Sequence, residues 1–186
     1  GIIVTGGGGV SSLLAKAQTK LGRLPLVTGR YIETFSGYID KERLSEETAR
    51  AAVRALKAKG AEIIVASEVY GVDDGEGEAV IARAAEKEKM KVTRASEISK
   101  LYGLTTRTRT AAVNASILPK MLDTADSTER SVKATGIQAP LMIMRGDGGV
   151  MSIEEMRKRP ILSMMSGPTA SVVGALMYLR ASVGIY

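Results

Sequence analysis

The sequence predicts an α/β protein with a mostly parallel sheet and helices on its faces. Short apolar runs rich in Ile and Val alternate with longer segments in which apolar residues recur at helical spacing. Several of these runs end in glycines and lead into a helix, as the strands of parallel sheets do. A length of 186 residues suits one compact domain or two small ones.

The first 40 residues contain two expected strands and one expected helix. A strand at 2–5 enters four consecutive glycines, and a helix is expected at 12–21. A second strand is expected at 24–28. The segment 31–40 stays ambiguous, because its apolar spacing is helical but Gly37 disfavours a helix.

The next 60 residues carry the clearest signals. A helix is predicted after Ser45, because a capping hydroxyl is followed by two acids at the positive end of the helix dipole. Residues 61–67 (AEIIVAS) form an apolar run typical of a buried strand. A helix at 76–89 and a strand at 91–95 follow, and 97–102 is expected to be a short helix or a loop.

Beyond this point the sequence indicates a boundary between two halves, near 104–110, and then two helices. A helix at 111–121 contains Pro119, which kinks it or begins a new turn. A separate helix at 127–135 is expected, with Asp126 and the acid three residues later as its capping box.

The last 50 residues contain two junctions from a strand through a Gly-containing loop to a helix. A strand at 141–144 precedes a glycine-rich loop and a short polar helix. A second strand is expected at 161–165, with a helix beginning at Ser166 and a further strand beginning near Gly184.

The composition excludes several classes of chemistry. The sequence has no His and no Cys, so it cannot assemble a Ser-His-Asp triad, a thiolate site or a typical zinc site. Any metal would be a hard ion such as Mg²⁺. The net charge is +6, but Lys and Arg are interleaved with Glu, and aromatics are only 4%, which argues against nucleic-acid binding. No apolar run approaches the roughly 20 residues that span a bilayer, so we expect a cytoplasmic protein with no membrane partner.

Two loops of the first half can be interpreted either as ligand-binding sites or as ordinary turns and solvated loops. The glycines at 6–9 have the geometry of a phosphate cradle, but they lack the residues of either common nucleotide-binding motif, which favours a turn. The acids between 73 and 78 lack the spacing of a calcium loop, which favours a solvated loop.

Polar residues after position 104 form a second group of candidates. If 107–110 is extended, Arg107 and Arg109 project from one face and could clamp a phosphate or carboxylate. The alternative is an exposed basic edge strand. Asn114 lies in an apolar helix and needs hydrogen-bond partners, which either helix packing or a site would supply.

The two C-terminal junctions are the strongest candidates. In open α/β sheets ligands bind at the carboxyl ends of strands, where Arg145 and Asp147 are expected. Asp147 could hold Mg²⁺ through water, orient a water molecule or cap a turn. Ser166 and Gly167 begin a helix, so their backbone N–H groups could face an anion; the alternative is tight packing of a small-residue helix on the sheet.

Five segments together resemble the hydantoinase A/5-oxoprolinase family. The most specific are RTRTAAVNASILPKM (107–121), APLMIMRGDGGVMSIEEMRKRPI (139–161) and SGPTASVVGA (166–175). The segments FSGYIDKERL (35–44) and SEISKLYGL (96–104) are similar to the N-terminal region of that family. The resemblance therefore extends over nearly the whole chain.

The resemblance implies a fold and an activity. Members have an actin/Hsp70/sugar-kinase-like (ribonuclease H-like) fold and use ATP with Mg²⁺ to open cyclic amides, by phosphorylating the amide oxygen; related members are ketone carboxylases. The implied partners are a small cyclic amide and a hydantoinase B-type subunit, and a homo-oligomer is possible. On this basis residues 1–104 are the remainder of the N-terminal domain, and residues 105–186 are the start of the hydantoinase A domain.

We expect particular residues to form the site of the parent enzyme. They are Asp147 and Arg145 for catalysis, Gly148, Gly149, Ser166 and Gly167 for the cofactor, and Arg107, Arg109 and Asn114 for the substrate. No metal ligand is assigned.

The chain departs from the family pattern at both phosphate loops. The first is missing, and the second would follow a strand that begins near Gly184, where the sequence stops. We therefore expect an internal fragment of an ATP-dependent enzyme that is inactive alone. A non-catalytic scaffold or dimerisation domain is the remaining alternative.

Overall fold

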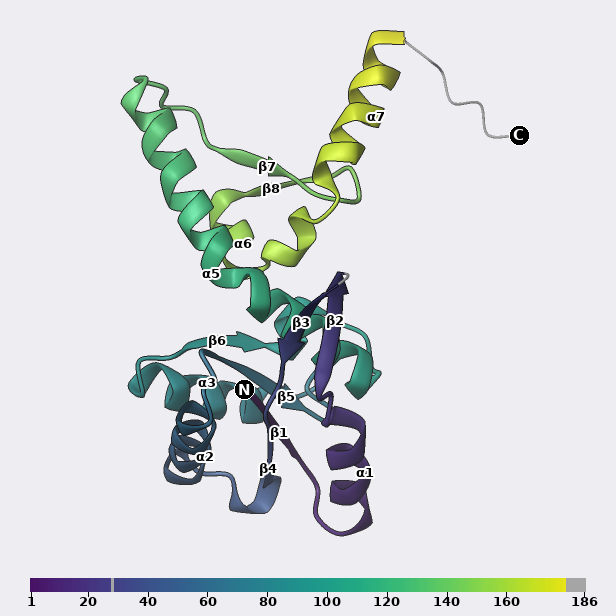
Figure 1. Ribbon diagram of the computed structural model, residues 1–186, viewed down its shortest axis with the longest axis vertical. Helices are drawn as coiled ribbons and strands as arrows, with labels where there is room; N and C mark the ends of the chain where they lie inside the picture. Colours follow the sequence, from purple (N-terminus) through teal and green to yellow (C-terminus); the bar gives the residue numbers. More distant parts are fainter. Residues whose placement is uncertain (28, 180–186) are drawn as a thin grey trace, which may run out of the picture. The chain divides into compact units, whose positions relative to one another are not determined.

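The computed structural model describes residues 1–27 and 29–179, which form two compact units, Gly1–Ser116 and Ile117–Tyr186 (Figure 1). The strand expected from Gly184 lies outside the described residues, as does Thr28 at the end of the expected second strand. The predicted domain boundary between residues 104 and 105 stays a prediction.

A four-stranded parallel sheet is the centre of the first unit. Its order is β4 (Ser36–Asp40), β1 (Ile2–Gly6), β5 (Ile63–Glu68) and β6 (Lys91–Arg94), with every neighbouring pair parallel. This arrangement confirms the predicted fold class. The chain leaves β1 toward one edge and returns on its other side through β5, so β1 and β5 flank the switch point where α/β proteins commonly bind ligands.

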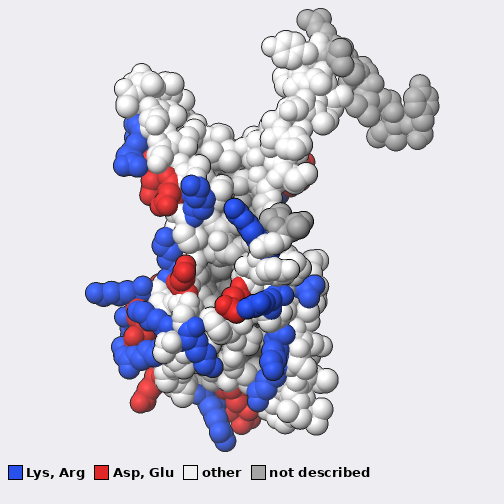
Figure 2. Space-filling model, viewed as in Figure 1, with Lys and Arg blue, Asp and Glu red and all other residues white. Residues whose placement is uncertain are grey.

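Helices cover this sheet. They are α1 (Val10–Thr19), α2 (Glu46–Ala58), α3 (Glu76–Lys87) and the short α4 (Ala95–Ile98), with a 3₁₀ turn η1 (Lys41–Arg43) before α2. The main core joins α2 and α3 to one face of the sheet through side chains such as Ile3, Val53, Ile64 and Ile81, each fully buried. Figure 2 shows acidic and basic side chains intermixed on one face of this unit.

The ambiguous segment 31–40 forms two strands instead of a helix. β3 (Arg30–Glu33) pairs antiparallel with β2 (Arg23–Val27), and β4 joins the parallel sheet as its edge strand. Burial of Ile39 against the core, with Tyr38 on the opposite face, shows the alternation of a strand.

Residues 107–110 are not extended, because a single helix, α5 (Leu104–Ala134), contains them. Helical geometry buries Arg107 and exposes Arg109, so the two guanidinium groups do not share a face. The separate helix capped by Asp126 is also wrong. Asp126 lies inside α5, where its carboxylate pairs with Arg157.

The second unit contains the later part of α5 and a β-hairpin. β7 (Met142–Met144) pairs antiparallel with β8 (Val150–Ser152), a strand that the sequence did not predict; α6 (Ile153–Lys158) and α7 (Ser166–Leu179) follow. Ala125, Met151, Ile153 and Met156 form a core cluster of buried side chains in this unit.

The strand expected at 161–165 is wrong, because Pro160–Ser163 forms a 3₁₀ turn, η2. Pro160 stands at the first position of the turn, and Leu162 N donates to Arg159 O at 3.1 Å. An apolar run of this length does not by itself distinguish a strand from a buried turn. The helix expected from Ser166 is confirmed.

Candidate functional site

The loop between β7 and β8 is a tight turn built around Asp147. Arg145 N donates to Gly149 O at 2.8 Å and Gly148 N donates to Arg145 O at 3.2 Å, which close the turn. Gly149 N donates to Asp147 Oδ1 at 3.0 Å, so the carboxylate caps the turn from inside. Gly148 has a φ of 89°, a conformation that glycine adopts without strain.

This loop packs directly on the start of α7. Gly146 N donates to Leu162 O at 2.8 Å, and Thr169 Oγ1 donates to Gly146 O at 2.8 Å. A Cβ atom on Gly146 would lie 2.1 Å from Met164 O, so only glycine permits this approach. The structure therefore brings together the two junctions, 145–149 and 166–169, that the sequence singled out separately.

The charged side chains of the loop form an ion pair. Arg145 Nη2 lies 2.5 Å from Asp147 Oδ2. The hydrogen bond from Gly149 N–H and this arginine both lower the pKa of Asp147, which is therefore ionised at neutral pH. Because the Asp147 side chain is 58% exposed, solvent screens the pair, and its main effect is to orient the guanidinium.

The beginning of α7 adds positive potential beside the loop. Ser166 and Gly167 are its first residues, and a helix N-terminus carries about half a positive charge. Gly167 has open space where a side chain would be. The donors at this site, Arg145 and the first N–H groups of α7, suit an anion such as a phosphate.

The same residues do not suit a divalent cation. Within residues 1–27 and 29–179 no group of three or more Asp, Glu, His or Cys side chains could hold a metal ion. Asp147 offers one carboxylate, which already accepts from Gly149 and pairs with Arg145. The described chain thus fits the phosphate of a nucleotide but not, unaided, its Mg²⁺.

The three predicted substrate ligands lie in the first unit, on α5. Arg107 is fully buried, and its guanidinium donates to four backbone carbonyl oxygens. Asn114 is also fully buried, whereas Arg109 is exposed. A role for any of them in substrate binding stays a prediction.

Sequence reasoning missed a charged cluster at the carboxyl end of β5. Lys41 Nζ lies 2.7 Å from the buried carboxylate of Glu68 and 2.9 Å from Asp74, and both acids raise the pKa of Lys41. Glu68 Oε2 accepts from Gly77 N at 3.0 Å. The position of Glu68 was the signal that could have found this cluster. The strand β5 was predicted, and Glu68 lies at its end, beside the switch point of the sheet.

A second buried acid lies beside this cluster. Glu78 accepts from Ser96 Oγ at 2.7 Å, from Ser96 N at 3.0 Å and from Glu68 N at 3.1 Å. Burial raises the pKa of Glu78, although these bonds and the nearby Arg107 oppose that shift. Glu78 thus stabilises the local backbone and has no open side from which to bind a ligand.

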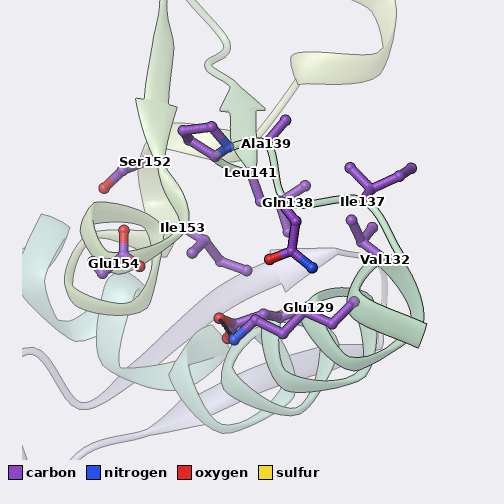
Figure 3. A pocket seen from close by; sticks show the side chains of 11 residues that line it. Glu129, Val132, Ile137, Gln138, Ala139, Leu141, Ser152, Ile153 and Glu154 are labelled. Atoms are coloured by element: carbon purple, nitrogen blue, oxygen red, sulfur yellow. Dashed lines mark ion pairs between the residues drawn. The ribbon is translucent and has the colours of Figure 1, made fainter. Parts of the chain in front are cut away.

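The second unit also has a small cavity of about 240 Å³ (Figure 3). Its walls combine the apolar side chains of Val132, Leu141 and Ile153 with the polar ends of Glu129 and Gln138. Lys133 and then Arg157 lower the pKa of Glu129 by direct pairing, at 2.8 and 2.7 Å. The cavity is chemically suited to a small neutral molecule with one polar edge.

In the described part of the chain no helix is both long and apolar enough to cross a membrane.

Fold and site together define an α/β protein in which a glycine-containing loop packs on the N-terminus of a helix. The hydantoinase/oxoprolinase family model matches residues 107–185. The match covers the Asp147 loop and α7, and it confirms the resemblance for the three C-terminal segments on which it was based.

Two solved structures share the fold. One, of an acetone carboxylase described as carrying out ATP-dependent acetone carboxylation, has a TM-score of 0.63 and 22% identity over 96% of this chain. The other is an ATP-dependent caprolactamase from Pseudomonas jessenii, with a TM-score of 0.66 and 18% identity over 97% of this chain. The chain spans 28% of the length of each. No protein of curated function matches the sequence.

Proposed function

We propose that this chain is part of an ATP-dependent amidohydrolase subunit that opens cyclic amides of the hydantoin or 5-oxoproline type. The observation that carries the proposal is the packing of the Asp147 loop on the N-terminus of α7, within the segment that matches the family. The fold shared with a caprolactamase supports it, because caprolactam is itself a cyclic amide.

The site supports a division of roles among its residues. Arg145 and the N–H groups at Ser166 and Gly167 would bind phosphate oxygens. Gly148 and Gly149, whose N–H groups close the turn, would line the cofactor site. Asp147 would hold Arg145 in place and orient a water molecule by accepting a hydrogen bond at its free lone pairs. When bound, ATP supplies the phosphoryl group that activates the amide carbonyl toward water.

A ketone carboxylase on the same scaffold is the second candidate. The fold shared with acetone carboxylase, over 96% of the chain, favours it as directly as the caprolactamase favours ring opening. Both candidates include a B-type partner subunit, a small-molecule substrate and a cytoplasmic location. The alternative in which the chain has no enzymatic role is a non-catalytic scaffold.

The test uses a longer protein that contains this sequence and both phosphate loops. Its ATP turnover is measured with 5-oxoproline, hydantoin, caprolactam, or acetone with bicarbonate. Stimulation by a cyclic amide supports the amidohydrolase, stimulation by acetone supports the carboxylase, and no stimulation by any of them contradicts both.

Variants of the same protein test the site. Asp147→Asn and Arg145→Gln are expected to lower kcat about 100-fold, the scale of loss when one preorganised polar group is removed. Asp123→Asn, an exposed change of equal charge on α5, is the matched control. Full activity of Asp147→Asn would show that the loop is not part of the site.

The isolated 186-residue chain is expected not to bind MgATP in a calorimetric titration, because the described residues offer no magnesium site. Tight binding by this chain alone would mean that the loop and α7 form a complete nucleotide site.

A further inference from the structure

A groove of about 440 Å³ lies at the amino end of β4, in the first unit. We call it the lysine groove. It is lined by Lys16, Thr19, Lys20, Gly22, Thr34, Phe35, Ser36, Gly37, Tyr38 and Lys59. Because β4 is parallel to β5, this end of the sheet is opposite to the end that holds Glu68 and Lys41.

The charged residues that line the lysine groove are all positive. Three lysines line it, Lys16, Lys20 and Lys59, and no Asp or Glu is among the described residues of its walls. Lys20 and Lys59 are also the C-caps of α1 and α2, whose ends each carry about half a negative charge. Three positive charges against two such ends leave a net charge of about +2, so the helix dipoles do not neutralise the groove.

The groove also gathers aromatic surface in a chain that has little of it. Aromatics are 4% of the sequence, and both Phe35 and Tyr38 are among the lining residues. Phe35 packs partly on the main core, so Tyr38 supplies the aromatic surface of the groove. Lys16 Nζ lies 5.1 Å from the centroid of the Tyr38 ring, within the range of a cation–π contact. A planar ligand would thus meet both ring surface and positive charge.

Backbone acceptors fix the walls of the groove. Thr34 donates to Gly22 O through both Oγ1, at 2.6 Å, and its backbone N, at 3.1 Å. Ser36 Oγ donates to Thr19 O at 3.1 Å. These bonds join the segment after α1 to the start of β4, so the groove does not need to be organised by a ligand.

We propose that the lysine groove binds a small aromatic anion, of the aryl carboxylate or aryl phosphate class. The lysines bind the anionic group and the ring of Tyr38 contacts the aromatic ring of the ligand. The site is separate from the Asp147 loop and does not depend on the function proposed above.

The experiment is an NMR titration of the ¹⁵N-labelled 186-residue chain with phenyl phosphate, benzoate, inorganic phosphate and benzyl alcohol. We expect saturable shifts at residues of the groove with phenyl phosphate and benzoate. Inorganic phosphate and the neutral alcohol are expected to bind at least about fivefold more weakly, since each lacks one of the two interactions. Affinity for phenyl phosphate should fall as salt is raised.

Paired variants identify the groove as the source of binding. Lys20→Gln with Lys59→Gln is expected to weaken phenyl phosphate about tenfold, while Lys91→Gln with Lys100→Gln makes the same charge change at exposed positions elsewhere and should leave it unchanged. Equal weakening by both pairs, equal binding of benzyl alcohol, or no saturable shift at the groove would each overturn the proposal.

Discussion

The side chain of Arg107 donates hydrogen bonds to backbone oxygens that are distant from it in the sequence. Its Nη1 donates to Leu101 O at 2.7 Å and to Tyr102 O at 3.1 Å, while Nη2 donates to Glu68 O and to Val69 O. One guanidinium thus joins the end of β5 to the segment before α5. A planar group with donors on several sides suits this task, and lysine would not reproduce it.

Replacing Arg107 should therefore destabilise the first unit. Arg107→Met is expected to lower the free energy of unfolding by about 3 kcal/mol, because buried carbonyl oxygens lose their donors. Urea denaturation followed by circular dichroism measures the loss. Arg109→Met, the exposed neighbour, should change stability by no more than about 0.5 kcal/mol. Equal effects of the two variants would contradict the structural role.

Glu78 gives the first unit a pH dependence of defined sign. Burial raises its pKa in the folded protein above the unfolded value, so the folded state binds the proton more strongly. Stability from this group is then present at low pH and is lost as pH rises through the folded pKa. We therefore compare the free energy of unfolding of the natural chain with that of Glu78→Gln. The natural value minus the variant value should fall from about pH 4 to about pH 7, because such a carboxyl titrates in roughly this range.

That difference is measured by urea denaturation at several pH values. Glu97→Gln, at an exposed position near the same segment, is the control and should give a difference that does not fall with pH. A rise with pH for Glu78→Gln would mean that hydrogen bonds to the carboxylate outweigh its burial.

Among the elements, α2 is the one that the sequence specified most fully. Ser45 was expected as its cap, and Ser45 Oγ accepts from Thr48 N at 3.2 Å while Thr48 Oγ1 accepts from Ser45 N at 2.9 Å. Glu46 and Glu47 lie in the first turn, where they favour the helix dipole. These are local interactions, and local interactions can be predicted from a sequence.

Ser45→Ala should lower the free energy of unfolding by about 1 kcal/mol, the usual value of a capping hydroxyl. Thermal and urea unfolding measure it, and Ser45→Asp should retain most of the stability because aspartate also caps helices. A loss of the same size in both variants would point away from capping.

The elements that the sequence did not predict depend on distant contacts. Residues 107–110 have a pattern compatible with an extended segment, but the partners of Arg107 include carbonyls of β5, 38 and 39 positions away, which a local pattern cannot contain. The 3₁₀ turn at Pro160–Ser163 likewise packs Leu162 on a core built from α5, β8 and α6. The contact between the Asp147 loop and α7 depends on that turn, so the sequence predicted its two parts separately.

At the scale of the whole molecule, the apolar surface of α7 is the feature that bears on association. The helix contains no charged residue, and Figure 2 shows its segment free of blue and red side chains on the face in view. Val172 is 60% exposed and Met177 is 76% exposed. A helix that is apolar on all sides is normally covered, so this one favours association.

The chain is therefore expected to self-associate with rising concentration, as sedimentation velocity would show. Val172→Glu with Met177→Glu should shift the distribution toward monomer, because the charges oppose burial of the helix. Thr124→Glu with Ser127→Glu adds the same charge to exposed positions of α5 and should not. A chain that remains monomeric at all concentrations would refute the expectation.

The exposed methionines just before α7 and near its end also have a redox consequence. Met164, Met165 and Met177 are 49%, 70% and 76% exposed, in a protein whose sulfur is entirely methionine. Peroxide converts such side chains to sulfoxides, which are polar, and methionine sulfoxide reductases reverse the change. Oxidation would thus make the same surface more hydrophilic without any change of sequence, and mass spectrometry of peptides from 160–179 would register it before any buried methionine reacted.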